Sequence, residues 1–226
     1  MSHLSNFDRI EQSMHFIRTN SFHSFHNFRT HPDFPNLCKE YIYFNQTLAR
    51  ATIPMMEEVI KSAEKLPDDP VCAPLIQYME QHIGEETDHD EWYVDDLAHL
   101  GLSRAEVFNR IPSPNTASLV GSVYYWVKHH HPIAFLGYMG SIETYPSTEA
   151  LVKDMINDSG LPEKAFDTIL MHARIDIEHS KDIRQLIDDL PLTEYHFNII
   201  ETTAFQTFRY LALVMNDICK LGPIKN

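Results

Sequence analysis

Two groups of histidine and acidic residues interrupt apolar rows at helical spacing. The first lies on a segment from residue 70 to 101, which is predicted to form one helix beginning near a proline and ending at a glycine. Read at alternating steps of three and four, one face of this helix carries Leu75, Met79, His82, Glu86, His89, Tyr93, Asp96 and Leu100. A face that begins and ends apolar is expected to point to the core, where an unpaired carboxylate is costly. The pattern therefore predicts that a cation meets this helix from inside the protein.

The second group lies on a segment from residue 162 to 190, also predicted to be one helix. Its matching face carries Ala165, Ile169, His172, Asp176, His179, Ile183, Leu186 and Leu190. The spacing of four and three residues places His172, Asp176 and His179 on the same side of the helix. Imidazoles and carboxylates are the ligands of iron, manganese and zinc in helical bundles, and the absence of cysteine from the set argues against structural zinc. Because a chain with 32 acids contains acid-x-x-His pairs by chance, the hypothesis depends on both helices together.

Other ligand-type residues give a weaker signal. Glu143 ends a short apolar row on a predicted helix from residue 132 to 145, and by itself it reads as a solvated carboxylate near a helix end. His82 shares the face of Glu86, where a hydrogen-bonding partner of a ligand or a core histidine is expected rather than a ligand. The triple histidine at residues 129–131 is expected to lie in solvent at the C-terminus of a helix.

The composition describes an ordinary soluble protein. The 226 residues, 43% of them hydrophobic, fit one domain over residues 1–226. Thirty-two acids against 18 Lys and Arg give a net charge of −14, which argues against nucleic acid and against an anionic membrane as partners. Cys38, Cys72 and Cys219 match no zinc spacing and no disulfide framework, and neither a signal peptide nor a membrane-spanning run is recognisable. A cytoplasmic protein with reduced thiols is expected.

Helices are expected along the whole chain, with short turns marked by Pro, Gly or Ser. The remaining helices are predicted at about residues 5–20, 36–65, 103–111, 115–130, 147–160 and 193–221. Ser103 and Glu106 form a capping box, and Pro54 is expected to kink the helix that contains it. Phenylalanines at every third position from residue 22 to 28 predict an aromatic packing edge. The fold class is therefore all-α, a single helical bundle.

At three segments the sequence resembles the haem-oxygenase-like non-haem iron oxidases and oxygenases. The segments are HIGEETDHDEWYVDDLAHLG, HPIAFLGYMGSIE and HARIDIEHS, and the similarity covers most of the chain from about residue 36. The ligand pattern of that family is a Glu on an early helix, then Glu-x-x-His, a lone Glu, and His-x-x-x-Asp-x-x-His. The last three parts match Glu86 and His89, then Glu143, then His172, Asp176 and His179. The resemblance implies a haem-oxygenase-like bundle of about seven to eight helices.

The resemblance also implies a ligand set for one or two Fe(II) ions per chain. His89 and His179 would hold one iron and Glu86 would bridge to a second iron held by Glu143, His172 and Asp176. For the early-helix ligand the candidates are Glu40, Glu57 and Glu58, and helical periodicity selects Glu58, although Pro54 disturbs the phase. Without that ligand, Glu86, His89 and His179 alone would still form a two-histidine, one-carboxylate triad. Whether one or two irons bind, and whether manganese replaces iron, stays open.

By the same resemblance the protein is expected to activate O₂ and oxidise a small organic substrate in an apolar pocket. Reactions in that family include N-oxygenation, C–C cleavage and decarboxylation, so the reaction type and substrate stay open. A homodimer and an external electron donor stay open as well.

Three rival interpretations share the scaffold. A relative resembling thiaminase II would need a nucleophilic cysteine, for which the three cysteines offer no catalytic context. A haem-binding relative would need a proximal histidine on the first helices, where His15, His23 and His26 are available. A non-catalytic interaction or iron-storage bundle would have the same fold, because fold alone does not define activity.

Overall fold

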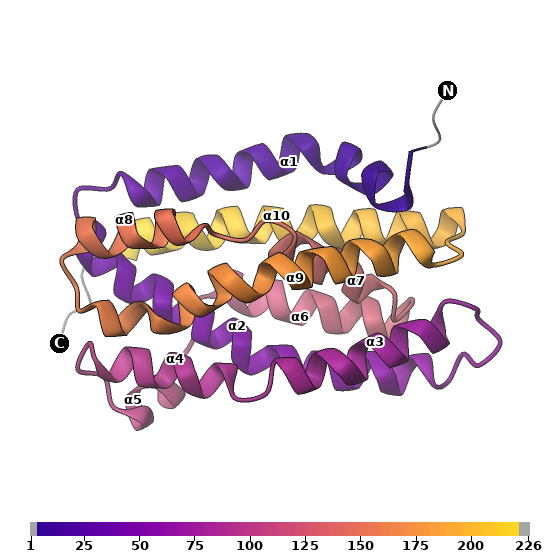
Figure 1. Cartoon of the computed structure of the whole chain (residues 1–226), viewed down its shortest axis with the longest axis horizontal. Helices are drawn as coiled ribbons and strands as arrows, with labels where there is room; N and C mark the ends of the chain where they lie inside the picture. The colour runs from indigo at the N-terminus through magenta and orange to yellow at the C-terminus, as the bar shows by residue number, and fades with distance from the viewer. Residues whose placement is uncertain (1–3, 222–226) are drawn as a thin grey trace.

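The protein is a bundle of α-helices in the computed structural model, which describes residues 4–221 (Figure 1). Its elements are α1 (Asn6–Arg29), α2 (Phe34–Ala63), α3 (Cys72–Glu85), α4 (His89–Ala98), α5 (Arg104–Asn109), α6 (Pro114–His129), α7 (Ala134–Glu143), α8 (Glu149–Ser159), the 3₁₀ turn η1 (Glu163–Phe166), α9 (Asp167–Asp189) and α10 (Glu194–Leu221). Within these residues no strand occurs, so the all-α prediction is confirmed. The helices predicted from the sequence are all present, and residues 4–221 form one α-helix more because the helix predicted from residue 70 to 101 is divided into α3 and α4.

The helices are layered so that α9 crosses the middle of the bundle. α1 and α10 lie side by side along one edge, and α3 and α4 follow each other along the opposite edge (Figure 1). α9 contacts α4 and α7, whereas α2 packs against α3, α4 and α6. The ends of α3 and α7, the start of α4 and the middle of α9 therefore converge in the interior.

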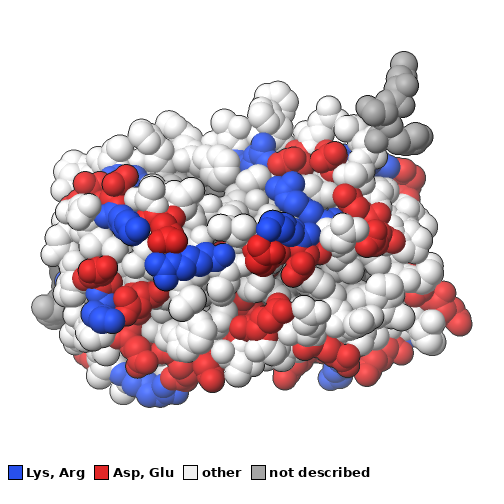
Figure 2. Space-filling model, viewed as in Figure 1, with Lys and Arg blue, Asp and Glu red and all other residues white. Residues whose placement is uncertain are grey.

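The surface carries both signs of charge without a cationic patch on the face in view. Acidic side chains spread across this face and the basic ones are interspersed among them (Figure 2). Among the described residues, no helix combines the length and the apolar character that crossing a membrane requires.

The first helix is longer than its sequence predicts. It continues past residue 20 to Arg29 because its phenylalanines pack between helices. Phe25 and Phe28 lie 5.9 and 5.2 Å, centroid to centroid, from the ring of Tyr41 on α2, and Phe28 is fully buried. Aromatic pairs at these distances contribute to stability beyond the area they bury. The aromatic packing edge is confirmed, and it belongs to a helix.

The predicted helix from residue 70 to 101 is wrong as a single element, because it breaks at Asp88. This residue has φ +70°, a left-handed conformation that Asp tolerates better than most residues. α3 ends with Glu86 as its C-cap, and α4 begins at His89. The break therefore places both of these ligand-type residues at helix ends that face each other.

Small residues allow α7 to approach α10 closely. A Cβ atom at Gly137 would collide with the side chain of Thr203 and the carbonyl oxygen of Ile200. The Thr203 hydroxyl donates a hydrogen bond to the carbonyl oxygen of Ala134 at 2.8 Å. This contact holds α7 in place, and with it the carboxylate of Glu143 at its C-terminal end.

Candidate metal centre

Four helices bring together a cluster of imidazoles and carboxylates that lies in the interior except for the exposed Glu85. The members are His82, Glu85 and Glu86 at the end of α3, His89 at the start of α4, Glu143 at the end of α7, and His172, Asp176 and His179 on α9. We call these residues the central cluster. The side chains of His82, His89 and His179 are exposed by only 1%, 2% and 9%. The buried positions agree with the apolar rows that the cluster interrupts.

Glu86 lies at the middle of the cluster, with each carboxylate oxygen facing a different histidine. Its Oε2 lies 3.0 Å from His89 Nδ1, and its Oε1 lies 3.9 Å from His179 Nδ1 and 4.0 Å from His82 Nε2. Burial raises the pKa of Glu86, but the neighbouring histidines, His89 first, outweigh burial and lower it. The residue is therefore an ionised carboxylate whose two oxygens can serve two cations.

His172 is oriented by the backbone so that one ring nitrogen is free. Its Nδ1–H donates to the carbonyl oxygen of Thr168 at 2.9 Å, which leaves the lone pair on Nε2. Burial lowers the pKa of His172, so the ring is neutral at pH 7, the form that binds a metal. The ring lies 4.8 Å from that of His89 and stacks on Tyr93.

Thr168 is held in turn by a buried acid. The carboxylate of Asp96 accepts the backbone N–H of Thr168 at 3.0 Å, and burial raises the pKa of Asp96 to about 6. A chain of contacts thus runs from α4 through the first turn of α9 to His172, and it fixes the direction of the imidazole.

The other half of the cluster surrounds His179. Glu85 Oε2 lies 3.7 Å from His179 Nε2, and Asp176 Oδ1 lies 3.7 Å from its Nδ1. The ring of His82 stands edge-on to that of His179 with centroids 4.7 Å apart. The histidines thus pair as His89 with His172 and as His82 with His179, whereas the resemblance to the iron oxidases assigns His89 and His179 to one iron.

The carboxylates of the cluster repel one another when no cation lies between them. Burial, followed by the charges of Glu143 and Glu86, raises the pKa of Asp176 to about 8. Burial lowers the pKa of His82, but the hydrogen bond and charge of Glu143 outweigh burial and raise it to about 9. Both shifts mean that the site retains protons that a divalent cation would displace.

Three buried atoms of the cluster make no hydrogen bond: His179 Nδ1, Glu143 Oε2 and His89 Nδ1, the last of which forms an ion-pair contact with Glu86 Oε2 at 3.0 Å without hydrogen-bond geometry. Each unpaired buried polar atom costs about 1–3 kcal/mol unless something binds it. Imidazole nitrogen and carboxylate oxygen are the donor atoms that suit iron, manganese and zinc. The residues present therefore fit a metal ion of this class.

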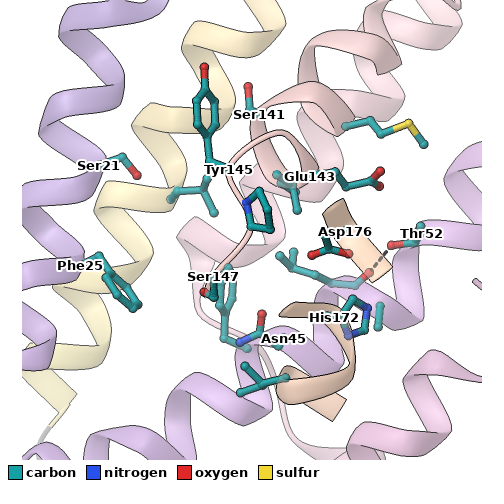
Figure 3. A pocket seen from close by; sticks show the side chains of 18 of the residues that line it. Ser21, Phe25, Asn45, Thr52, Ser141, Glu143, Tyr145, Ser147, His172 and Asp176 are labelled. Atoms are coloured by element: carbon teal, nitrogen blue, oxygen red, sulfur yellow. Dashed lines mark hydrogen bonds between the residues drawn. The ribbon is translucent and has the colours of Figure 1, made fainter. Parts of the chain in front are cut away.

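Four members of the cluster, Glu86, Glu143, His172 and Asp176, line one side of a cavity of about 560 Å³. Figure 3 shows Glu143, Asp176 and His172 close together at one side, with Thr52 of α2 beside them and Phe25 of α1 on the far side. The rest of the lining is mainly apolar and comes from α1, α2, α7, α9 and α10. A volume of about 300–1,000 Å³ is usual for small-molecule sites.

The sequence-predicted residues meet in this cluster with one exception, Glu58. Its carboxylate lies 3.4 Å from Lys128 Nζ on α6 and it does not line the cavity, so the structure does not bring the predicted early-helix ligand into the cluster. Where α2 passes the cluster it presents Asn45, Ala49 and Thr52. The other two candidates on α2 fare no better, because Glu40 pairs with Arg110 and Glu57 is exposed to solvent.

Two residues, Glu85 and His131, make contacts that the sequence pattern did not predict. Glu85 lies beside the apolar row, yet its carboxylate accepts a hydrogen bond from His82 Nδ1 at 3.0 Å. The available signal was its spacing of three residues from His82, which places the two side chains on one side of the helix. His131 was expected in solvent and is buried, because it packs at the turn between α6 and α7.

Fold and site together define an all-α bundle with a buried histidine and carboxylate cluster at a cavity wall. The family model described as iron-containing redox enzyme matches residues 55–207, more than half of the chain. The protein belongs to this family. A comparison with curated proteins gave no significant match.

Solved structures share the fold at low sequence identity. A TenA homologue from Pseudomonas syringae superposes with TM-score 0.75 at 11% identity over 94% of this chain and 91% of its own. A domain of unknown function with a haem-oxygenase-like fold from Shewanella denitrificans has TM-score 0.75 and 19% identity, with 94% and 90% coverage. A CADD-like protein of unknown function from Nostoc punctiforme has TM-score 0.67 and 14% identity, with 96% and 97% coverage. The haem-oxygenase-like fold is thereby confirmed.

Proposed function

We propose that this protein is a non-haem iron-dependent oxidase or oxygenase that activates O₂ at the central cluster and oxidises a small organic molecule. The proposal rests on one observation: a buried cluster of imidazoles and carboxylates, some of whose atoms have no hydrogen-bond partner, lies beside a cavity of about 560 Å³ that Glu86, Glu143, His172 and Asp176 line. Membership of an iron-containing redox family supports iron over zinc or manganese.

The six sequence-predicted ligands would hold one or two Fe(II) ions. Geometry groups Glu86 with His89 and His172, and it leaves Glu143, Asp176 and His179 as donors for a second ion. Bound Fe(II) with open coordination positions supplies the electrons and the binding site that O₂ needs for activation. An external electron donor would complete the turnover.

The residues of the chain prepare this chemistry by orientation and by exclusion of water. The Thr168 carbonyl holds His172 Nδ1–H, so Nε2 faces the other ligands. Burial raises the pKa of Tyr93 and of Tyr138, so both phenols keep their protons beside the site. The apolar lining from α1 and α10 would bind the carbon skeleton of a substrate and keep water from the reacting atoms.

The rival enzyme interpretations lack residues at the cavity. No cysteine is among the described residues that line it, and burial raises the pKa of Cys38 to about 12, which argues against a thiaminase-like nucleophile although TenA homologues share the fold. His15, His23 and His26 are exposed on α1 and point away from the interior, so they do not offer a proximal haem ligand. A non-catalytic bundle has no need of a roomy cavity beside its carboxylates.

Anaerobic reconstitution with Fe(II), followed by metal analysis and measurement of O₂ uptake, tests the proposal. We expect one or two irons per chain, and O₂ uptake that rises when a suitable small molecule and a reductant are added. The variant His89→Ala serves as the matched control, since it keeps the cavity and removes a ligand. A parent protein that binds no Fe(II), or that takes up no more O₂ than this variant under any condition, contradicts the proposed function.

A further inference from the structure

His82 is the most deeply buried imidazole of the central cluster, and both of its ring nitrogens face carboxylates. Nδ1 lies 3.0 Å from Glu85 Oε2, and Nε2 lies 3.2 Å from Glu143 Oε1 and 4.0 Å from Glu86 Oε1. The ring therefore spans from α3 to α7 at the centre of the ligand set. The family ligand pattern assigns no role to this position.

Glu85 determines which nitrogen of His82 faces inward. The carboxylate of Glu85 accepts the Nδ1–H of His82, and it is itself held by the side-chain amide of Gln81 at 2.9 Å. A carboxylate that holds one imidazole nitrogen while the other binds a metal is a recurrent arrangement in metalloproteins. Nε2 is thus the nitrogen that faces the ligand set, where its hydrogen bond to Glu143 Oε1 at 3.2 Å occupies the place that a metal ion would take.

The donors around His82 form a second set beside that of Glu86, His89 and His172. Ligand atoms of His82, Glu85 and His179 all lie within 4.8 Å of one another. Two further atoms at this place have no hydrogen-bond partner, Glu143 Oε2 and His179 Nδ1. The second set therefore contains two imidazoles, those of His82 and His179. It receives no carboxylate from α2.

We propose that His82 is itself a metal ligand, binding through Nε2, and that it takes the coordination position for which α2 offers no carboxylate. Glu85 is its positioning residue. The proposal rests on the proposed function, because the same cluster must bind iron. It adds a nitrogen ligand to the second metal, which His179 and Glu143 would share with His82, while Glu86 spans the two ions.

The test is an anaerobic titration with Co(II), whose visible absorption reports the ligand set, paired with equilibrium dialysis against Fe(II). We expect the parent to bind two ions per chain. His82→Ala and the better-packed His82→Gln should keep one ion at parental affinity and bind the second at least about 100-fold more weakly, with changed absorption. Glu85→Gln should weaken the second ion by about 10–100-fold.

A matched control is Tyr78→Phe, because the Tyr78 ring stacks on His82 with centroids 5.6 Å apart but contributes no ligand to the proposed sites. This variant should bind both ions like the parent. If His82→Gln also binds both ions with parental affinity and absorption, the proposal is wrong and only a proton separates His82 from Glu143.

The outcomes separate this proposal from the proposed function. A parent that binds no metal overturns both. A parent that binds one ion, with affinity and absorption unchanged in His82→Gln, overturns only the role of His82 and leaves a mononuclear site. If the variants do not fold, crystals of the parent loaded with Co(II) decide. A metal about 2.0–2.3 Å from His82 Nε2 supports the proposal, and bound metal with the contact between His82 and Glu143 intact overturns it.

Discussion

The structure contains two clusters of histidines and acidic residues. They differ in whether imidazole Nδ1 donates a hydrogen bond to the backbone or accepts one from it. Besides the central cluster, His131 Nε2 and His196 Nε2 lie 3.3 and 3.5 Å from the same oxygen of Asp69. The two rings are 4.9 Å apart, and Cys72 lies close by. We call these four residues the end cluster. By residue type alone it is as good a candidate for a metal as the central one.

Backbone partners separate the two clusters. In the end cluster, His131 Nδ1 accepts the N–H of Ile133 at 3.1 Å, and His196 Nδ1 accepts the N–H of Thr193 at 3.3 Å. A neutral imidazole whose Nδ1 accepts keeps its proton on Nε2, so both rings present N–H groups to Asp69. His172 has the reverse arrangement, since its Nδ1 donates to a carbonyl oxygen.

The comparison shows that a cluster of ligand-type residues is a metal site only if lone pairs are free to bind. Asp69 connects the α2–α3 turn to the α6–α7 turn and to the first turn of α10 through two histidines, which is a structural role. The end cluster has one buried atom without a hydrogen-bond partner, His131 Nε2, and that nitrogen carries the N–H because Nδ1 accepts from the backbone. The central cluster has three such atoms, on His89, His179 and Glu143. Experiments that remove one histidine or one acid from each cluster test this difference.

The largest expected effect is on iron. His89→Ala should weaken Fe(II) binding more than the about 10–100-fold that follows loss of an outer partner of a ligand. It should also abolish the stabilisation by iron, about 2.7 kcal/mol when Fe(II) is at 100 times its Kd. Equilibrium dialysis and thermal unfolding with and without Fe(II) measure both.

The matched variant in the end cluster is His131→Asn, because an Asn side chain can still accept a backbone N–H two residues on. This variant should bind as much Fe(II) as the parent. Equal loss of iron in both variants would mean that the two clusters do not differ in the way proposed.

The next effect is on stability. Asp69→Asn should lower the free energy of unfolding by about 1–3 kcal/mol at pH 7, because two buried imidazole N–H groups lose a charged acceptor. Burial raises the pKa of Asp69, but the Val71 N–H and the two histidines outweigh burial and lower it. A depressed pKa in the folded state stabilises the protein above the unfolded pKa of about 4, and this stabilisation is lost as the pH falls through the folded value.

The difference in unfolding free energy between the parent and Asp69→Asn should therefore be largest near neutral pH and shrink in acid. Urea unfolding at several pH values measures it, and Fe(II) content should stay at the parental value throughout. A variant that loses iron would assign a metal to the end cluster instead.

Helical phase explains which site residues could be predicted from sequence. His172, Asp176 and His179 lie on the unbroken helix α9, so their shared face follows from spacing alone. Glu86 and His89 were also predicted from the sequence. The helix is broken between them, but these two residues, three apart, remain neighbours across the turn that joins α3 to α4. The left-handed Asp88 could not be predicted, since the surrounding acids are compatible with a continuous helix.

The position of Glu58 along α2 and around its axis explains why this residue lies outside the cluster. The positions of α2 that line the cavity are Tyr41, Phe44, Asn45, Leu48, Ala49 and Thr52, and one helical turn after Thr52 comes Met56. Glu58 lies two residues further, about 200° round the helix. The apolar row that selects Glu58 shares Tyr41, Phe44 and Leu48 with the cavity wall, but the part of α2 that lines the cavity ends at Thr52, before the row reaches Glu58.

The smallest expected effect is at Glu58. Its side chain is 15% exposed and that of Lys128 is 49% exposed, so water screens their ion pair. Glu58→Gln should leave iron stoichiometry and affinity unchanged and lower the unfolding free energy by about 0–1 kcal/mol, the range of such pairs. Lys128→Gln is the matched control and should have a similar effect, because each variant removes the same pair. Loss of iron in Glu58→Gln but not in Lys128→Gln would instead bring Glu58 into the metal site. In that event the early-helix carboxylate would be present, and His82 would not be needed to replace it.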